Sequence, residues 1–364
     1  MGIFRSDEAI FAAKDEAVYA SGTIWPAISG QTGTHIGILP SVTIPGPDVD
    51  WERYWTTGTD RESAIQGERR RSIEGIEAPI ILQKAEIFRY VFDGQNSHTS
   101  RSDSTNSSAS GTSNTTHSFR TASDLTIGPN ASLTLDAPDL RSLTLQVSFP
   151  SGTSTSYWSR YYTGAKIDSI RLEADSESEL SANVSFKAAS VFDYWDAATI
   201  VPDRTTQPYL FHTATFSYRG STVARVTEFE LTINNNLKSN WYLTQQTGGT
   251  STIGRAGGRY LYDLIPGKRE YELRAKVVID SELNPSIWNS LLNGAEFSAN
   301  FLFERTAGTT ASNADRLQIF LEGVVFKKAP HSVPEDKADI PVDIDATARK
   351  GYVVVVNAQA GMTL

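Results

Sequence analysis

Four acidic residues at alternate positions are the strongest candidate for a chemical site in this chain of 364 residues. Glu173, Asp175, Glu177 and Glu179 would share one face of an extended strand, because every second side chain points the same way. The cluster could bind calcium, although the glycine-centred loop of an EF-hand is absent. It could also be the solvated tip of a hairpin, or a negative patch on a surface to which something must not stick. The sequence leaves these interpretations open.

No other catalytic, metal or cofactor site is indicated. The glycine-rich run GGTSTIGRAGGR lacks the Gly-Lys-Ser/Thr of a phosphate-binding loop, and no GxSxG serine elbow occurs. The chain has no cysteine, which excludes disulfides and thiol catalysis. We therefore expect a protein that is not an enzyme and uses no metal or cofactor. The five histidines are scattered, without the spacing of a metal site: His35, His98, His117, His212 and His331.

The net charge of −9 is unevenly distributed along the chain. Residues 1–204 hold 17 basic and 26 acidic residues, whereas residues 205–364 hold 16 of each. An acidic first part argues against tight binding of nucleic-acid phosphates there. No apolar run reaches the roughly 18 residues that span a bilayer, so we expect no membrane association.

Sheet-forming patterns must position these residues. The stretch from Leu210 to Val226 and the run TEFELTINNN after it alternate apolar and polar side chains between turn residues, which is typical of a β-meander. In that run Phe229, Leu231 and Ile233 should face the core. Further strands are expected at 71–77, 80–92, 124–135 and 142–149, and a hairpin is expected at 167–172 with 180–188.

Two short helices and two long irregular segments interrupt the strands. We expect one helix at 6–17, capped by a serine, and one at 284–294 with Leu292 on its buried face. The Gly/Pro-rich segment 24–47 is typical of an arm. The Ser/Thr-rich tract 95–123 should be a surface loop, either mobile or ordered against a neighbouring subunit.

The last strand of the chain is a candidate for contact with another subunit. Its uncharged run consists of Tyr352, Val353, Val354, Val355 and Val356. A run that apolar is either buried on both faces or paired with another chain, since an exposed apolar edge aggregates. No local partner is obvious, so we predict an inter-subunit strand.

Five aromatic residues are candidates for an interface. They are Trp158, Tyr161, Tyr162, Trp241 and Tyr242. Aromatic side chains are enriched in protein interfaces, but the cluster around Trp158 would also suit stacking on sugars. The aromatic residues alone do not separate a protein partner from a carbohydrate.

Three parts of the chain resemble the tail tube protein family of long-tailed bacteriophages. They are the meander together with KIDSIRLEADSESELSANVSFKAASV before it and RYLYDLIPGKREYELRAKVVIDSELNPSIWNSLL after it, the early run WERYWTTGTDRESAIQGERRRSIEGIEAPIILQKAEIFRYVFDG, and the closing run RLQIFLEGVVFKKAPHSVPEDKADIPVDIDATA. The resemblance covers most of the chain. It implies a mainly β fold with β-sandwich or β-barrel domains, each flanked by a short helix, and long arms and loops.

The length predicts two tandem domains of this type. Residues 1–204 would form the first, with the N-terminal arm and the loop 95–123, and residues 205–364 the second, with the C-terminal strand. Strand–turn–strand patterns on both sides of the joint at 205–208 are consistent with a duplication. Because the resemblance implies rings of six sandwiches, a two-domain chain would form three-fold rings. Rings of six chains are the alternative.

The resemblance implies a structural subunit of a virion tail tube. Self-assembled rings would stack into a tube whose lumen conducts DNA during ejection, without specific binding of the DNA. Other partners would be tape measure and tail-end proteins, and assembly would take place in the host cytoplasm. Because the first part of the chain is acidic, we expect a net negative lumen. The alternative is a β-sandwich receptor- or carbohydrate-binding virion protein of the tail fibre or adhesin type.

Overall fold

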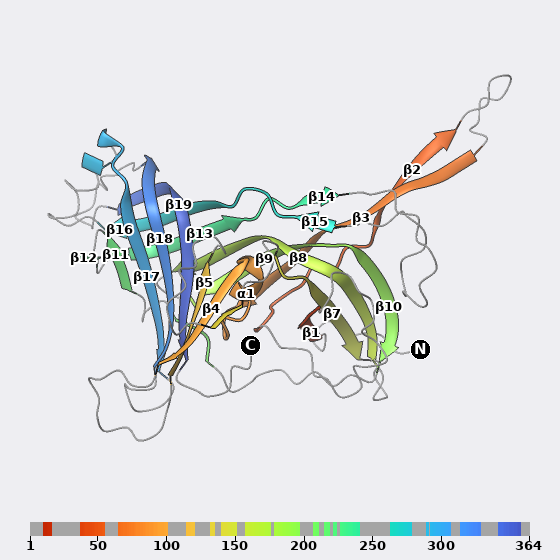
Figure 1. Cartoon of the computed structure of the whole chain (residues 1–364), viewed down its shortest axis with the longest axis horizontal. Coiled ribbons are helices and arrows are strands. Elements are labelled where there is room, and N and C mark those ends of the chain that lie inside the picture. Colours follow the sequence, from red (N-terminus) through yellow and green to blue (C-terminus); the bar gives the residue numbers. More distant parts are fainter. Residues whose placement is uncertain are drawn as a thin grey trace.

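Among the residues that the structure describes, the protein is almost entirely antiparallel β-structure; helix is confined to the four residues of α1 (Phe88–Val91) and to positions 289–290 and 292–293 (Figure 1). The mainly β fold class is confirmed. A computed structural model describes residues 10–16, 37–54, 65–100, 114–120, 132–134, 140–150, 157–175, 178–196, 207–210, 215–218, 221–223, 226–240, 263–278, 289–290, 292–306, 314–328 and 341–357.

One hydrogen-bonded network joins 17 strands, and β14 pairs separately with β15. The strands of the described residues are β1 (Ile10–Asp15), β2 (Asp48–Tyr54), β3 (Ile65–Ile81), β4 (Gly94–Ser100), β5 (Asn114–Arg120), β6 (Ser132–Thr134), β7 (Leu143–Pro150), β8 (Tyr157–Asp175), β9 (Ser181–Ala188), β10 (Ser190–Asp196), β11 (Thr215–Tyr218), β12 (Ser221–Val223), β13 (Val226–Asn234), β14 (Lys238–Asn240), β15 (Asp263–Ile265), β16 (Glu270–Val278), β17 (Phe297–Thr306), β18 (Ala314–Lys328) and β19 (Pro341–Asn357).

The centre of the network is a sheet with the strand order β3, β9, β8, β13, β16, β19 and β18, which we call the charged sheet. Burial alternates along its strands, so one face is apolar and buried and the other is polar. Phe229, Leu231 and Ile233 are buried, which confirms the alternation expected for this run. The hairpin expected from 167–172 and 180–188 is also confirmed, as β8 and β9.

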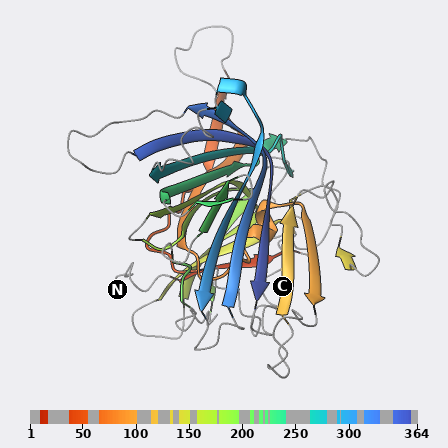
Figure 2. The same ribbon diagram turned by 90° about the vertical axis from the view of Figure 1, so that its left-hand side faces the viewer.

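Two further groups of strands continue from the charged sheet. One has the order β1, β7, β8, β10. The other has the order β12, β11, β17, β18, β19, β5, β4, β6, and in Figure 2 its blue strands β17 to β19 lie beside the orange β4 and β5. A single apolar cluster unites both groups with the charged sheet; Val147, Leu172 and Phe303 are fully buried members from the three parts.

Three long strands bend at glycines. Gly75 in β3, Gly164 in β8 and Gly323 in β18 have φ angles of 76°, 62° and 61°, and the pairing register shifts beside each one. A positive φ is strained for other residues, so these glycines make bulges that turn the strand. As a result β8 pairs with β10 up to Thr163 and with β9 from Lys166 onward.

The outer edge of β3 is covered by its own chain. Ile38 bridges to Ile81, and Thr43 donates its backbone N–H to the carbonyl of Glu77 over 2.9 Å. The first part of β3 pairs with β2, and this hairpin extends beyond the body of the molecule in Figure 1. The expected arm at 24–47 is described from residue 37 onward, where it follows β3.

Two local predictions near the N-terminal part of the chain are wrong. Residues 10–15, expected to be helical, form β1, because pairing with β7 buries Phe11, Ala12 and Ala13 together. Burial on both sides of the backbone favours a strand over an amphipathic helix. The strand expected at 80–92 ends at Ile81, and α1 follows it.

The Ser/Thr-rich tract is not only a loop. Residues 94–100 and 114–120 form the hairpin β4–β5, while the rest of the tract lies outside the described residues. β5 joins the edge of β19 and buries Phe119, the one large apolar residue of the tract. A long-range pairing therefore supplies the stability that the local sequence lacks.

The second expected helix is described only at 289–290 and 292–293. Gly294, with a φ of 58°, ends it as expected, but Leu292 is 66% exposed instead of buried. At the expected joint between domains, Tyr209 is buried and hydrogen-bonds to the backbones of Leu82 and Leu180. The division into 1–204 and 205–364 stays a prediction. No helix of the described residues has the length and apolar character to cross a membrane.

Candidate functional surface

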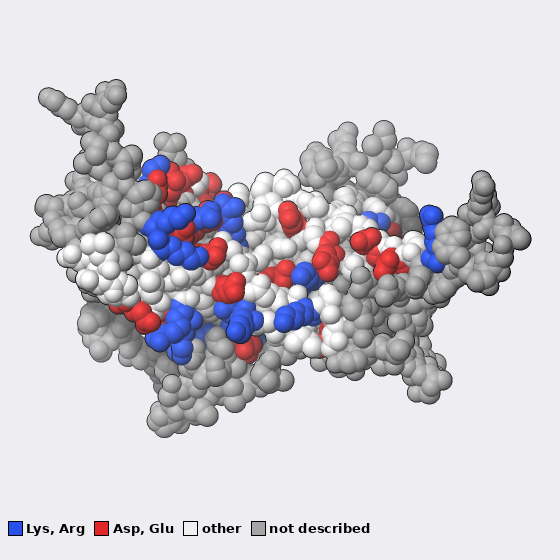
Figure 3. Space-filling view, turned by 90° about the horizontal axis from the view of Figure 1, so that it is seen from above, with Lys and Arg blue, Asp and Glu red and all other residues white. Residues whose placement is uncertain are grey.

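The polar face of the charged sheet carries charged side chains on five neighbouring strands. They point to this face because they alternate with the buried residues of the same strands. Acidic side chains outnumber basic ones, and Figure 3 shows both signs mixed over the molecule seen from above. The set is Arg171, Glu173 and Asp175 of β8, Glu228 and Glu230 of β13, Glu272, Arg274 and Lys276 of β16, Asp343 and Asp345 of β19, and Lys327 and Lys328 of β18.

Cross-strand register arranges these side chains in rows. One row runs from Asp175 through Glu228 and Lys276 to Asp343. The Nζ of Lys276 lies 3.0 Å from Oε1 of Glu228, and this hydrogen bond raises the pKa of Lys276. The ammonium group therefore sits between two carboxylates of neighbouring strands and offsets their repulsion.

The next row runs from Glu173 through Glu230 and Arg274 to Asp345. Arg171 donates to Glu230 over 2.9 Å and also pairs with Glu173, and Arg274 approaches Glu230 at 3.6 Å. Like charges directly opposite each other on neighbouring strands are destabilising. The arginines relieve that cost at the point where Glu173 and Glu230 face each other.

These ion pairs contribute little to stability. The side chains of Arg171, Arg274 and Lys276 are 48%, 62% and 37% exposed, and solvent-exposed pairs contribute about 0–1 kcal/mol each. Their main effect is on the surface potential, because each cation offsets the charge of the carboxylates beside it. On β9 the face continues with Ser181, Asn183, Ser185 and Lys187.

A hollow of about 640 Å³ lies over the charged rows and is lined by the same side chains. Within the described residues no group of three or more His, Cys, Asp or Glu side chains could hold a metal ion. The chemistry that the face offers is therefore electrostatic: a wet, charged and mostly acidic sheet surface.

The cluster of four acidic residues between positions 173 and 179 is divided by a turn. Glu173 and Asp175 lie on the charged face, whereas Glu179 follows the turn, is exposed and bridges to Leu210; Glu177 lies outside the described residues. The backbone N–H of Asp175 donates to the hydroxyl of Ser178 over 3.0 Å, where β8 ends. One extended strand therefore does not carry all four carboxylates.

The expectation that the last apolar run lacks a partner within the chain is wrong. Val353 pairs with Ile319 of β18 on one side and with Phe119 of β5 on the other, and Val355 is paired in the same way. Both valines are buried in the core. Their backbone groups are thus used within the chain, and a second subunit could reach this strand only through side chains such as Tyr352.

Most of the candidate interface aromatics serve the fold. Tyr161 and Tyr162 are fully buried, with Tyr161 stacked on Phe192 and the hydroxyl of Tyr162 donating to the carbonyl of Pro45 over 2.7 Å. They are therefore not available to a partner, because the strands around β8 enclose them. Trp158 is half-buried and stacks on Phe149 at 5.4 Å. Trp241 and Tyr242 lie outside the described residues.

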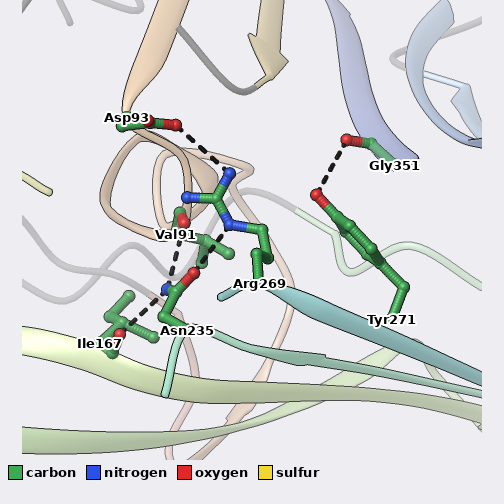
Figure 4. Close-up of polar contacts among 7 residues, drawn as sticks. All are labelled: Val91, Asp93, Ile167, Asn235, Arg269, Tyr271 and Gly351. Carbon is green, nitrogen blue, oxygen red and sulfur yellow. Dashed lines mark hydrogen bonds and ion pairs between the residues drawn. The ribbon is translucent and has the colours of Figure 1, made fainter. Parts of the chain in front are cut away.

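A buried polar cluster at one end of the charged sheet was not predicted from the sequence (Figure 4). Asn235, 1% exposed, donates its side-chain amide to the carbonyls of Val91 at 3.2 Å and Ile167 at 3.0 Å. Its Oδ1 accepts a 2.8 Å hydrogen bond from Nε of Arg269. Arg269 also pairs with Asp93 at 3.2 Å. We call Asn235, Arg269 and Asp93 the polar hub.

Only one weak signal in the sequence indicates the position of the polar hub. The Asn234–Asn236 run indicated the end of a strand, and Asn236 indeed takes a left-handed conformation with φ of 51°. Nothing distinguishes Asn235 from its neighbours before the chain is folded. Its partners lie on α1, on β8 and before β16, so only the tertiary structure reveals the cluster.

Comparison with known proteins adds one result. Residues 41–348 match the model of a protein family described as phage tail tube protein. This range includes the charged sheet, the polar hub and most of the described strands. No curated protein matches the chain.

Proposed function

Because the chain belongs to the phage tail tube protein family, we propose that its copies assemble into stacked rings and that the polar face of the charged sheet lines the lumen. The observation that carries this proposal is one continuous sheet with an apolar face packed in the core and a charged face left uncovered by described residues. Closing such sheets around an axis would place their charged faces on one inner wall.

The charge of that face suits a conduit for DNA. A wall rich in lysine and arginine would retain the DNA, because each neutralised phosphate releases counterions and the affinity compounds over many contacts. On the charged face, carboxylates such as Glu228 and Asp343 outnumber the cations between them. Lys276 and Arg274 reduce the repulsion without reversing the sign. DNA would pass such a wall without specific binding.

Three chains per ring fit the geometry of the charged sheet. β8 of residues 1–204 pairs directly with β13 of residues 205–364. A continuous wall would need the same strand-to-strand pairing between neighbouring sandwiches, and this chain makes one such pairing within itself. In a three-chain ring, intrachain joints would alternate with interchain joints around a pseudo-six-fold wall. The alternative ring of six chains would need twice as many interchain joints.

The remaining assignments follow from membership of the family. The protein would act in the virion tail after assembly in the host cytoplasm, and its partners would be further copies of itself together with tape measure and tail-end proteins. The competing proposal, a carbohydrate- or receptor-binding virion protein, has lost its best site, because Tyr161 and Tyr162 are buried within the fold.

Electron microscopy of the purified protein at rising concentration tests the proposal. Tubes or stacked rings are the expected result, and the rotational symmetry of a tube cross-section separates three chains from six. Chains that stay monomeric at every concentration and bind on a glycan array would support the competing proposal instead.

A further inference from the structure

We infer that the polar hub sets the curvature of the charged sheet and thereby the number of chains that close a ring. The inference rests on the proposed function, since it concerns the geometry of the assembled ring. It assigns to Asn235 and Arg269 a positioning role, because they hold together the segments whose angle decides closure.

Asn235 has no freedom to move. Both hydrogens of its side-chain amide are donated, its Oδ1 accepts from Arg269, and its backbone N–H donates to the carbonyl of Asp168 over 2.7 Å. Its backbone carbonyl accepts from Gly267 over 2.9 Å. A buried amide with every group satisfied is rigid, because any displacement leaves a polar group unpaired in a medium of low dielectric constant.

Arg269 extends this rigidity to a third segment. Its guanidinium pairs with Asp93, where α1 leads into β4, and its Cζ lies 5.1 Å from the ring centre of Phe92. The planar guanidinium fixes direction as well as distance, which a lysine cannot do. Together with Asn235 it joins α1, β8 and the connection from β13 to β16 at one point (Figure 4).

A second set of contacts holds the same connection against β8 and β9. The carboxylate of Asp168 accepts from the backbone N–H of Leu237 over 2.8 Å and pairs with Lys187 at 3.2 Å. Lys187 also donates to the carbonyl of Leu237 over 3.1 Å. The segment after β13 is therefore clamped on β8 from two sides.

The clamped point lies at the joint between the two parts of the chain. β8 and β13 pair from Ser169↔Asn234 to Asp175↔Glu228, and within the described residues of the charged sheet this is the pairing that connects residues before and after 205. The hub sits directly beyond Asn234. It therefore holds one end of this pairing, in addition to the contact that β5 makes with β19 outside the charged sheet.

A small change of angle at this joint is multiplied around a ring. Neighbouring strands twist by about 20–25° on average but range from roughly 10° to 35°, so backbone pairing alone leaves the angle loosely defined. A head-to-tail contact closes a ring only if the rotation per chain divides a full turn; otherwise it produces an open helix. A joint that every ring contains must therefore hold one angle.

The test uses two hub variants and a matched control. Arg269→Lys keeps the charge beside Asp93 but removes the planar Nε donor, and Asn235→Ala removes the amide. Lys268→Ala, the control, removes a neighbouring exposed cation whose side chain is outside the hub. Because the chain has no cysteine, cysteines placed at Asn183 and Lys327 provide unique spin-label sites across the charged sheet. The labels would be on the order of 20–25 Å apart.

Two readouts are taken from each protein: the label distance in unassembled chains and the rotational symmetry and diameter of tubes. We expect a broader distance distribution and tubes of altered or mixed diameter for both hub variants, and wild-type behaviour for Lys268→Ala. Folded hub variants with the wild-type distance and symmetry would overturn the inference. So would a conservative Arg269→Lys chain that cannot fold, because a positioning residue leaves the sheet intact.

Failure of the proposed function gives a different result. If wild-type chains form no rings, the part of the inference that concerns ring size is refuted together with the proposed function. The label distances then still decide whether the hub fixes the joint within one chain.

Discussion

The hydroxyl of Tyr271 donates a hydrogen bond to the carbonyl of Gly351 over 3.2 Å, and the phenol ring occupies the space where a side chain at position 351 would begin. This contact links β16 to β19 at the point where β19 leaves the charged face and enters the core beside β5 (Figure 4). Glycine is required here by packing and not by the backbone angle.

Gly351→Ala should therefore reduce stability. A Cβ would lie 2.7 Å from Cε1 of Tyr271 and 3.1 Å from Leu321, which is overpacking in a buried place and costs about 1–3 kcal/mol. Urea denaturation measures the loss. Gly46→Ala is the matched control, because nothing lies within 4 Å of the new methyl group, and it should change stability by less than about 0.5 kcal/mol. Equal effects of the two changes would contradict this account.

The glycines that bend long strands should differ in their tolerance of alanine. Gly75 and Gly323 both have positive φ, so alanine is strained at either site by about 1–2 kcal/mol. At Gly323 the new Cβ would also lie 3.0 Å from the Cβ of Arg349, whereas at Gly75 it meets nothing within 4 Å. We expect Gly323→Ala to be the more destabilising change in thermal unfolding. The reverse order would show that the bend of β3 carries more strain than its geometry indicates.

Reversal of charge on the proposed lumen face should make tubes retain DNA. Glu228→Lys combined with Glu230→Lys leaves the core untouched and removes only solvent-exposed ion pairs, those with Lys276, Arg171 and Arg274, so the loss of stability should be small. Co-sedimentation of assembled tubes with DNA should rise and should fall again with added salt. The matched control is Glu296→Lys with Glu322→Lys, an equal charge change at exposed residues outside the charged rows. Equal retention by both double variants would place the lumen elsewhere.

Removal of residues 351–364 should abolish folding. Burial of the side chains of Val353 and Val355 stabilises the fold by about 1.5–3 kcal/mol each. The deletion would also remove the β19 partner of β5 and of residues 316–321 of β18. That loss approaches the total stability of a typical domain. Circular dichroism during heating should show no cooperative transition. A truncated chain that still forms normal tubes would refute this prediction.

At alkaline pH the hydroxyl of Tyr162 should contribute less to the free energy of unfolding. Burial raises the pKa of Tyr162 to about 12, whereas the unfolded phenol ionises near 10. Since the folded state holds the proton more tightly, the stabilisation is complete below pH 10 and is lost as the pH rises from about 10 to 12. The difference in unfolding free energy between the wild type and Tyr162→Phe should therefore shrink over this window. A constant difference would show that the hydroxyl is solvated.

The sequence predicted those elements whose stability is local. β13 could be recognised because Phe229, Leu231 and Ile233 bury one face of a single strand, so residues 228–234 alternate between polar and buried side chains. The charged face follows from the same alternation, and Glu173 and Asp175 were found for that reason. Their cross-strand partners could not be found, because register between β8 and β13 depends on both strands at once.

Elements that depend on distant partners escaped prediction. β5 has almost no apolar residues of its own. It becomes a strand because it pairs with β19, more than 200 residues later, and because this pairing buries Phe119 in the core. β1 has helix-forming alanines, yet pairing with β7 decides its conformation. Asn235 belongs to the same class: three segments must meet before its amide has partners.

The extended pairing of β18 with β19 also has a mechanical consequence. The two strands stay in register from Arg316↔Val356 to Phe326↔Ala346, from the core region to the beginning of the charged face. Antiparallel hydrogen bonds lie perpendicular to the strands. Tension along the strands therefore loads all of these bonds together in shear, whereas peeling would break them one after another. A subunit pulled along this direction yields only when the whole ladder fails at once.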